Sequence, residues 1–585
     1  MSYSNSFPTQ TPSLNLNFAT GSDQFLDSRI SFSRADTPPT YAAPSAVHYW
    51  SNEKHLSSEN LITQSQFSGW AKLTSPTVTA AYTNGPDGSS NTATRLQSAS
   101  GSHRYFYSTA TSWTSGQQYT VSCWVKSNTG VAQTFAFFLP STAYATADLT
   151  THATDWTRIT ATFTAYASST YCGFKLLSAN TTDLSIWGFQ VNSGANALDY
   201  QATSGQIHRS YAPTLKSVAN AGDPRFEYDP ASDGQSVGLL IESQATSLIT
   251  YSEDFSNSFW DKTRLSVDSN VATAPDGALT ASALRVDGTA ASTHRMRFTY
   301  ATGGATAQTF SIFAKAGSKS WLALKFDSSG GAFDASIAYF NLASGTTGTV
   351  DSGVTATIND CGNGWYRCSV TRTALASATG QIELYVAEAD NDVSIDGNSY
   401  DHILCWGAQV EANTSAPSSY IKSNSGSSTT KSADSCSVAL SDAGYNGGPV
   451  TGIVEANNIG KPYPTFATLT DSTANQRVMV QGSSTASIVE TFVVVGGSVV
   501  ANPNSALTLS SSKVGFRCDT DNFATVVNGG TVATDTSGPQ PATMTTLHIG
   551  SKQDGNFQVN GTIGRLSLYS AALSNVELQS LTSNP

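Results

Sequence analysis

Apolar and polar residues alternate along most of the chain. One run has Tyr119, Val121, Cys123 and Val125 at every second position, and turn residues recur about every 8–12 positions. A period of two places successive side chains on opposite faces of a strand. The pattern therefore predicts an all-β chain built of sandwiches, in which one face of each sheet is buried.

Two long stretches carry the same succession of motifs. Five blocks of the first return in the same order in the second: residues 60–70 and 247–260, 85–96 and 274–285, 119–126 and 309–315, 155–158 and 364–367, and 184–191 and 402–410. Five matched blocks in one order indicate a duplication. We therefore predict two copies of one jelly-roll sandwich, at residues 55–207 and 246–425.

The repeated blocks include tryptophans at equivalent places, among them Trp187 and Trp406. A buried aromatic side chain removes about 150–250 Å² of surface from water. We therefore expect these tryptophans in the sandwich cores. The alternative is that they are exposed and stack on sugars.

A third sandwich is predicted for residues 434–585, behind a Gly/Ser/Thr-rich linker at 426–433. Asn-Gly pairs that begin at Asn528 and Asn560 favour hairpin turns of type I′. Ser574 followed by Glu577 forms a capping box, which predicts one short helix at the end of the chain.

Composition and charge exclude several classes. The chain has 585 residues, 42 acidic and 30 basic side chains, a net charge of −12 and only 12% charged residues. This length suggests about three to five domains. No Lys/Arg-rich run provides the positive surface that nucleic acids require. No stretch approaches about 20 apolar residues, and residues 1–8 do not resemble a signal peptide. We expect neither membrane insertion nor export through such a peptide.

The seven cysteines are odd in number and lie mostly in apolar runs. In such runs a thiol behaves as a small hydrophobic group. We expect buried free thiols and assembly in a reducing cytoplasm. A disulfide between Cys361 and Cys368 across the intervening Gly-Asn-Gly turn is the alternative.

No catalytic motif is present. The sequence has no His-Glu-x-x-His, Gly-x-Ser-x-Gly, Walker or dinucleotide-binding pattern, and its eight histidines are scattered. We therefore predict that the protein is not an enzyme. A pair of carboxylates for glycoside cleavage is defined by its spacing in space, so a polysaccharide-degrading enzyme stays an alternative.

Candidate binding residues are few. Trp113, in a polar setting, and Tyr105 and Tyr107 lie outside a clean core pattern and could stack on pyranose rings. Packing in a core or between domains is the alternative. Asp519 and Asp521 offer hard oxygen ligands for calcium, although such residues also form solvated turns. All ten tryptophans lie at or before Trp406, so the third sandwich offers only Tyr and Phe for stacking.

Five segments together resemble a signature of tailed-bacteriophage virion proteins: residues 14–18, 29–35, 224–230, 238–242 and 248–253. The proteins of this group that the segments resemble are tail-fibre, tail-appendage or head-fibre proteins with carbohydrate-binding-like jelly rolls. In such relatives the Ser-Arg-Ala segment continues through a Thr-Tyr pair into Pro-Arg-Phe. Here Thr40-Tyr41 and Tyr211 lie far apart. We therefore predict that the first copy is inserted into an N-terminal platform, residues 1–54, that continues at 208–245.

The third sandwich resembles the concanavalin A-like/laminin G-like fold. Residues 526–530, 547–551, 560–566 and 573–578 carry this resemblance. It implies the fold and leaves open whether the unit binds sugar, protein or another ligand.

The resemblances imply a virion protein, assembled in the host cytoplasm and exposed on the particle. It would act as a fibre or appendage adhesin for host surface glycans, with other virion proteins as partners and with homo-oligomers, expected to be trimers. No cofactor is expected, with calcium as the one candidate. The alternative is a tail, baseplate or head-decoration protein that binds no sugar.

Overall fold

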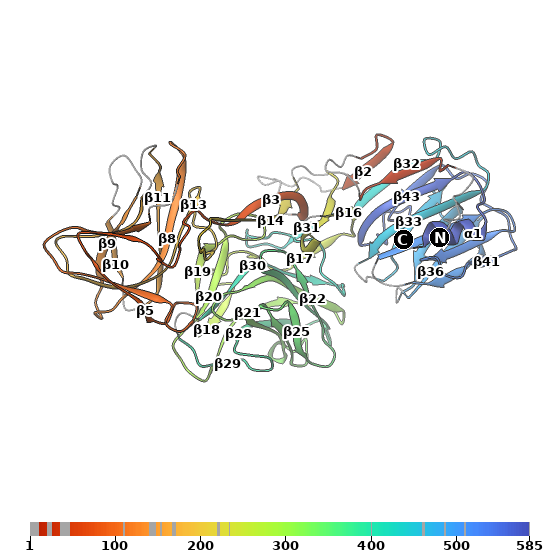
Figure 1. The fold of residues 1–585 in the computed structure, drawn as a ribbon. Coiled ribbons are helices and arrows are strands. Elements are labelled where there is room, and N and C mark those ends of the chain that lie inside the picture. Colours follow the sequence, from red (N-terminus) through yellow and green to blue (C-terminus); the bar gives the residue numbers. More distant parts are fainter. Residues whose placement is uncertain are drawn as a thin grey trace.

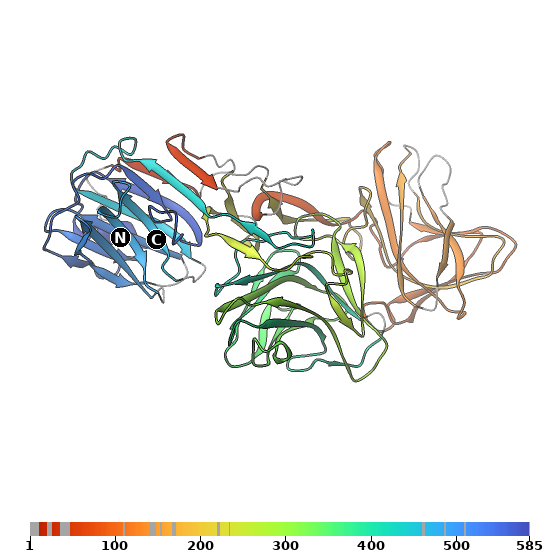
Figure 2. The same ribbon diagram turned by 180° about the vertical axis from the view of Figure 1, so that it is seen from behind.

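The computed structural model describes residues 11–19, 26–34, 47–108, 112–139, 148–152, 155–166, 171–218, 223–232, 235–398, 401–458, 462–484, 487–507 and 511–583. They form strands β1 to β43, two 3-10 turns, η1 (Pro230–Ser232) and η2 (Ser328–Gly330), and the helix α1 (Asn575–Thr582). The all-β prediction is confirmed. Three sandwiches lie in a row, with the first copy at one end, the C-terminal sandwich at the other and the second copy between them (Figures 1 and 2).

The first copy has two five-stranded antiparallel sheets, ordered β10-β9-β12-β7-β4 and β11-β8-β13-β6-β5. Its strands are β4 (Ala71–Leu73), β5 (Thr77–Thr83), β6 (Ala93–Ser98), β7 (Arg104–Ser108), β8 (Gln118–Ser127), β9 (Gln133–Phe138), β10 (Asp148–His152), β11 (Thr157–Thr164), β12 (Cys172–Leu176) and β13 (Thr182–Ser193).

The second copy has the same strand order in both sheets, β24-β23-β28-β21-β18 and β27-β22-β30-β20-β19, with β25, β26 and β29 added at the edges. Its strands are β18 (Asp261–Thr263), β19 (Leu265–Ala272), β20 (Ala281–Val286), β21 (Ser292–Ala301), β22 (Ala307–Ala316), β23 (Trp321–Asp327), β24 (Ser336–Asn341), β25 (Thr346–Val350), β26 (Thr355–Asp360), β27 (Trp365–Thr373), β28 (Thr379–Ala387), β29 (Ser394–Ile395) and β30 (His402–Ala412). The repeated motifs therefore lie on equivalent strands.

The Trp-Gly step of each copy lies at a β-bulge, in β13 and in β30. Gly188 and Gly407 have φ angles of 65° and 60°. A Cβ at Gly407 would lie 3.0 Å from the Phe313 ring, and one at Gly188 would lie 3.1 Å from the Tyr200 ring. Only glycine combines this backbone with this close approach.

In both copies, an arginine side chain packs on an aromatic ring near the bulge. Arg158 lies 4.6 Å from the centre of the Trp124 ring, and Arg367 lies 5.3 Å from the centre of the Phe313 ring. Both guanidinium groups also donate to a backbone carbonyl, at 2.7 Å and 2.8 Å.

In the second copy, Trp365 and Trp406 of the repeated Trp-x-Arg and Trp-Gly blocks are buried, but in a cluster with Phe313 and Tyr420 that is separate from the core between the sheets. Trp156 of the first copy is only half-buried. The tryptophans of these two blocks therefore do not lie in the sandwich cores where the sequence places them.

The C-terminal sandwich contains two eight-stranded sheets. The first consists of β1 (Leu14–Asn17), β15 (Phe226–Asp229), β16 (Gln235–Ile241), β33 (Val450–Asn458), β39 (Ser511–Cys518), β40 (Phe523–Val527), β41 (Ala533–Asp535) and β43 (Gly561–Tyr569). The second consists of β2 (Ile30–Arg34), β32 (Asp434–Ala439), β34 (Thr465–Thr470), β35 (Gln476–Gly482), β36 (Ile488–Val495), β37 (Ser498–Ala501), β38 (Asn504–Ala506) and β42 (Thr546–Ile549).

Strands of the expected N-terminal platform belong to this sandwich instead of forming a unit of their own. Both β1 and β16 pair with β43, and β2 pairs with β32. Leu14 and Leu16 are buried in the same core as Leu566 and Leu568. Without β1 and β16, one edge of β43 would expose unpaired backbone groups, which is unfavourable for a long apolar strand. Residues 434–585 therefore do not complete the sandwich alone.

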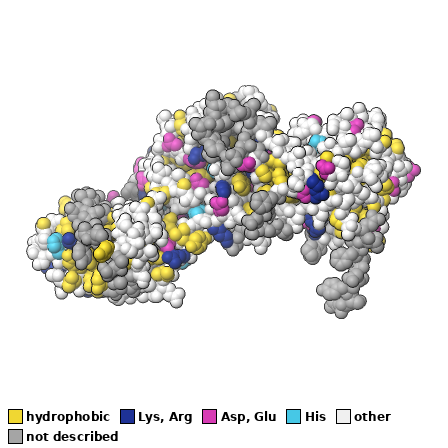
Figure 3. Space-filling view, turned by 90° about the horizontal axis from the view of Figure 1, so that it is seen from above, with side chains coloured by type: hydrophobic (Ala, Val, Ile, Leu, Met, Phe, Trp, Pro, Cys, Tyr) yellow, Lys and Arg dark blue, Asp and Glu magenta, His cyan; other side chains and the backbone are white. Residues whose placement is uncertain are grey.

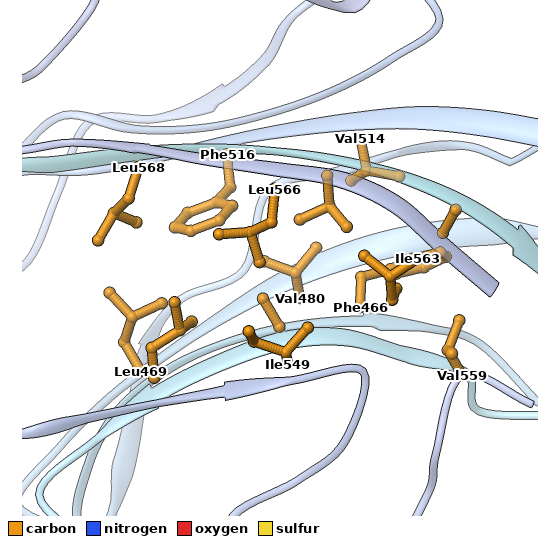
Figure 4. Close-up of a cluster of buried hydrophobic side chains, with 14 of the residues drawn as sticks. Phe466, Leu469, Val480, Val514, Phe516, Ile549, Val559, Ile563, Leu566 and Leu568 are labelled. Atoms are coloured by element: carbon orange, nitrogen blue, oxygen red, sulfur yellow. The ribbon is translucent and has the colours of Figure 1, made fainter. Parts of the chain in front are cut away.

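The core of the C-terminal sandwich lies between its two sheets (Figure 4). Leu566 and Phe516 point from one sheet toward Leu469 and Ile549 of the other. All four side chains are at most 1% exposed. Alternating apolar residues on both sheets build this core, in agreement with the period-two pattern of the sequence.

Two antiparallel ladders connect the sandwiches. In the first, β3 (His48–Asn60) pairs with β14 (His208–Ser217), and these strands lead into and out of the first copy (Figure 1). In the second, β17 (Ala245–Ser247) pairs with β31 (Thr429–Lys431). The predicted linker at 426–433 thus contains a paired strand. Lys431 at its end is fully buried, and its ammonium group pairs with the Glu242 carboxylate at 3.1 Å and donates to the Ser243 carbonyl at 2.9 Å.

The predicted turns have different outcomes. Asn528 and Gly529 both have positive φ and close a type I′ turn, in which Gly530 N–H donates to the Val527 carbonyl at 2.9 Å. The hairpin predicted at Asn560 is wrong, because the following glycine is the first residue of β43. The Asn560 side chain instead accepts from Ser243 N–H at 2.9 Å.

The helix α1 begins as predicted, with a complete capping box between Ser574 and Glu577. All seven cysteines lie in the described part of the chain, and all are buried and unpaired, so free thiols are confirmed. Among the described residues, no helix has the length and apolar character that a membrane crossing requires.

Candidate functional site

Tyr105 and Tyr107 lie on β7 and point to the outer face of the sheet β10-β9-β12-β7-β4. Between them, Phe106 points inward and is 1% exposed, while both tyrosines are half-buried. The alternation of a strand thus turns the two candidate residues to the same side. The tryptophan predicted with them, Trp113, lies elsewhere.

Phe138 and Tyr171 join these tyrosines in an exposed cluster, which we call the aromatic face. Phe138 contacts Tyr105 and Tyr107 edge to face, with ring centres 5.0 Å and 5.7 Å apart. Tyr171 contacts Tyr107 at 5.2 Å and stacks on Phe138 at 6.2 Å. Such contacts hold the four rings in one orientation. Tyr171 is 42% exposed, so the face is open to solvent.

The residues of the aromatic face come from β7, from β9 and from the end of the loop before β12. The ladder places Tyr107 opposite Gly173 of β12, and Gly173 opposite Phe138 of β9. Glycine is required here because a Cβ would lie 2.3 Å from the Phe106 carbonyl oxygen. Leu73 of β4, opposite Tyr105, extends the apolar surface and is 54% exposed. Hydrophobic side chains reach the surface at the end of the molecule that holds the first copy (Figure 3).

The aromatic face combines flat rings with available polar groups. The hydroxyls of Tyr105, Tyr107 and Tyr171 make no hydrogen bond with other described residues. Lys175, opposite Tyr105 on β12, is half-buried and supplies an ammonium group at the border. Rings that pack against C–H groups, next to hydroxyl donors, match the mixed surface of a pyranose ring.

Sequence reasoning missed Phe138 and Tyr171. Phe135 and Phe137 are buried on β9, so the period of two already places Phe138 on the outer face. That signal was present in the sequence. No local pattern indicates that Tyr171, just before β12, contacts Phe138.

Trp113 packs at the other sheet of the first copy. Its ring contacts Tyr119 of β8 at 5.1 Å and Phe163 of β11 at 5.7 Å, both edge to face. It is half-buried against the core of the copy. The structure therefore does not bring Trp113 together with Tyr105 and Tyr107.

Asp519 and Asp521 form a turn after β39. The Asp519 carboxylate accepts from Thr520 N–H, and the Asp521 carboxylate accepts from Gly538 N–H, both at 2.8 Å. Asp521 has a φ of 54°. Within the described ranges, no three His, Cys, Asp or Glu side chains are grouped as for a metal ion. The Asp519 carboxylate thus caps its own turn, the Asp521 carboxylate ties this turn to the loop after β41, and calcium binding here stays a prediction.

The second copy has a different surface on the equivalent sheet. Glu383 is fully buried between Arg295 and Lys325, and its distance to the Lys325 ammonium group is 3.0 Å. The Tyr385 hydroxyl donates to the same carboxylate at 2.5 Å. Asp327 also binds Lys325, at 2.7 Å. The charges of this face are therefore neutralised by one another.

A buried ionic cluster joins the second copy to the C-terminal sandwich. Arg225 is 0% exposed and binds Glu242 at 2.7 Å and the Ser419 hydroxyl at 2.8 Å, and it also binds Asp434. Burial alone would raise the pKa of Glu242, but Lys431 and Arg225 more than offset it and hold this pKa well below its usual range. Residues of the phage-like signature thus form the junction between two sandwiches.

Glu227, in the same signature, is half-buried near this junction, with its carboxylate oxygen Oε2 shielded from solvent. Its carboxylate accepts from Trp50 N–H of β3 at 3.2 Å. Burial raises its pKa to about 8, because a charged carboxylate is poorly solvated there. Glu227 is therefore neutral in the folded protein below about pH 8.

Comparisons with known proteins give weak structural likenesses. No family model matches the chain, and no curated protein matches its sequence. A Ruminococcus gnavus IT-sialidase CBM40 bound to α2,3-sialyllactose is 15% identical, with a TM-score of 0.21, over 23% of this chain and 83% of that chain.

Two multi-domain structures are also similar. The CBM22-1–CBM22-2 tandem of Paenibacillus barcinonensis Xyn10C is 10% identical, with a TM-score of 0.18, over 63% of this chain and 99% of that chain. Domains LG4-5 of the mouse laminin α1 chain are 8% identical, with a TM-score of 0.18, over 51% of this chain and 92% of that chain. Likeness at this level carries no argument about function.

Proposed function

We propose that this protein is an adhesin that binds host surface carbohydrates through the aromatic face of its first copy. The observation that carries the proposal is the cluster of Tyr105, Tyr107, Phe138 and Tyr171, which is open to solvent on one sheet. Exposed aromatic clusters on a rigid sheet are unfavourable in water unless a ligand covers them. Their orientation is already set by ring contacts, so binding costs little ordering entropy.

The proposed mechanism is passive adhesion. A shallow face with a few rings binds a sugar weakly, and several copies on one particle raise the effective concentration of sites. The resemblance of residues 224–230 and 238–242 to phage virion proteins supports a place on a tailed-phage particle. There the chain would contact other virion proteins and assemble as a homo-oligomer, expected to be a trimer.

The test uses the whole chain on an array of bacterial surface polysaccharides. We expect the double variant Tyr107→Ala/Phe138→Ala to lose at least about tenfold in apparent affinity, which corresponds to about 1.4 kcal/mol. Tyr211→Ala is the matched control, because Tyr211 is 59% exposed and lies on β14, away from the aromatic face. This control should bind like the unaltered chain.

Two outcomes contradict the proposal. Equal binding by the double variant and the unaltered chain would show that the aromatic face is not the site. Absence of binding to every polysaccharide would favour a structural tail, baseplate or head-decoration protein. Release of reducing sugar from a bound polysaccharide would instead identify an enzyme.

A further inference from the structure

A cleft of about 470 Å³ lies between the second copy and the C-terminal sandwich, far along the chain from the aromatic face. Leu248 and Asn413 line it from the second copy, Phe557 and Asn560 from the C-terminal sandwich, and Gln244 from the segment between them. This volume lies within the range of small-molecule sites, which is about 300–1,000 Å³.

Phe557 is held in an unusual conformation at this cleft. Its φ is 54°, a value that bulky side chains rarely adopt, and its side chain is 43% exposed. Tyr463 beside it has the same φ of 54° and the same exposure of 43%, and the two ring centres lie 5.7 Å apart. Backbone strain of this kind tends to occur at binding sites.

The surrounding structure maintains this strain. The Phe557 carbonyl accepts from Thr465 N–H at 3.1 Å, and Tyr463 N–H donates to the Ser483 carbonyl at 3.1 Å. The Lys552 ammonium group lies 4.4 Å from the centre of the Phe557 ring. The cation fixes one face of this ring by a cation–π contact. The ring is thereby presented in one orientation.

Polar groups suited to a sugar line the same cleft as Phe557. The side-chain amides of Gln244 and Asn413 are exposed and form no hydrogen bond with any other described residue. Glu411 also lines the cleft, but its carboxylate accepts from Gln409 at 2.7 Å and from Ser418 N–H at 2.9 Å. Two free amides can each donate and accept, as a polyol requires. The carboxylate disfavours an anionic ligand.

We infer that this cleft is a second binding site, for a neutral saccharide. The Phe557 ring stacks on one face of the sugar, and the amides of Gln244 and Asn413 bond its hydroxyls. The site is independent of the aromatic face, because it shares no residue with that face and lies between different sandwiches. It would add a second contact of the same ligand class to each chain.

The experiment uses the full chain and photoreactive diazirine derivatives of lactose, maltose and N,N′-diacetylchitobiose. Cross-linked peptides are mapped by mass spectrometry, which separates the two sites directly. We expect at least one probe to label peptides that contain residues 411–414 or 551–560. We expect this labelling to fall at least fivefold in the variant Gln244→Ala/Asn413→Ala/Phe557→Ala and to persist in Tyr107→Ala/Phe138→Ala.

Controls keep the result interpretable. Tyr211→Ala should label like the unaltered chain, and thermal unfolding should show that each variant is folded. The inference is overturned if no probe labels these peptides, or if the triple variant is labelled as strongly as the unaltered chain. Labelling confined to residues 104–108 or 133–138 overturns the inference while supporting the proposed function. Labelling confined to the cleft supports the inference and contradicts the proposed function.

Discussion

The first and second copies differ most on the outer face of one equivalent sheet. The residues that follow Trp70 and Trp260, Ala71 and Asp261, are equivalent and align the two sheets. Ala71 lies opposite Tyr107, and Asp261 lies opposite Arg297. From there the rows across the sheet read Ala71, Tyr107, Gly173, Phe138 in the first copy and Asp261, Arg297, Glu383, Lys325 in the second. One row is aromatic and open, and the other is a set of ion pairs.

Two polar contacts, by contrast, are the same in both copies. The Ser65 hydroxyl bonds the Tyr200 hydroxyl at 3.0 Å, and the Ser252 hydroxyl bonds the Tyr420 hydroxyl at 2.9 Å. The indole of Trp187 donates to a threonine hydroxyl at 3.2 Å, and the indole of Trp406 does so at 3.1 Å. Buried polar groups must keep their partners, whereas an outer face is free to change. Duplication therefore kept the fold, while the outer face of one sheet diverged between the copies.

The largest expected effect on stability comes from replacing the glycine at the β-bulge that the two copies share. We expect Gly407→Val and Gly188→Val each to destabilise their own copy by about 3–5 kcal/mol. The left-handed backbone and the contact with a neighbouring ring contribute together. Denaturant unfolding followed by tryptophan fluorescence measures this effect. Equal stability of either variant and the unaltered chain would contradict the role of the bulge.

The next effect depends on pH and concerns the half-buried Glu227 at the junction. Because burial raises the folded-state pKa of Glu227 from 4.5 to about 8, its contribution to stability is full below about pH 4.5 and is lost as pH rises to about 8. We expect Glu227→Gln to remove about 4–5 kcal/mol of this pH dependence.

Denaturant unfolding at a series of pH values between about 4.5 and 8 checks this prediction. The unaltered chain, measured at the same pH values, is the control. An unchanged slope in Glu227→Gln would show that Glu227 is ionised in the folded protein.

A smaller effect on stability is expected from removing one charge of the ion pairs on the outer face of the second copy. Glu383→Gln leaves Arg295 and Lys325 without their shared carboxylate, and we expect a loss of about 2 kcal/mol in the stability of the second copy. This figure is below that for fully buried pairs, because both cations are 25% exposed. Asp261→Asn at the exposed border is the control and should cost less than about 1 kcal/mol.

The smallest effect on stability is expected on the aromatic face. Tyr107→Ala should cost about 1 kcal/mol or less, because the ring is half-buried and contacts Phe138 and Tyr171 on the outer face. The same variant should weaken carbohydrate binding. A large loss of stability, measured by thermal unfolding, would indicate that the rings are structural and would weaken the contrast between the copies.

Part of this molecule is predictable from local sequence. The alternation of apolar residues determines the strands, the five repeated blocks identify equivalent strands in two copies, and Ser574 with Glu577 determines where α1 begins. The period of two also places Tyr105 and Tyr107 on the same side of their strand, although only the structure shows that this side is the outer one. Each of these features depends on residues close together in the chain, where dihedral preference and periodicity act directly.

The remainder depends on which distant segments pair. Leu14 lies opposite Leu568, so strands expected in a platform complete the C-terminal sandwich. Asn560 continues into β43 because that strand has partners on both sides, which overrides the turn preference of an Asn-Gly pair. The aromatic face likewise exists only once β7, β9 and β12 align. Pairing across long separations is decided by burial and backbone hydrogen bonding in the folded molecule, and no local pattern encodes it.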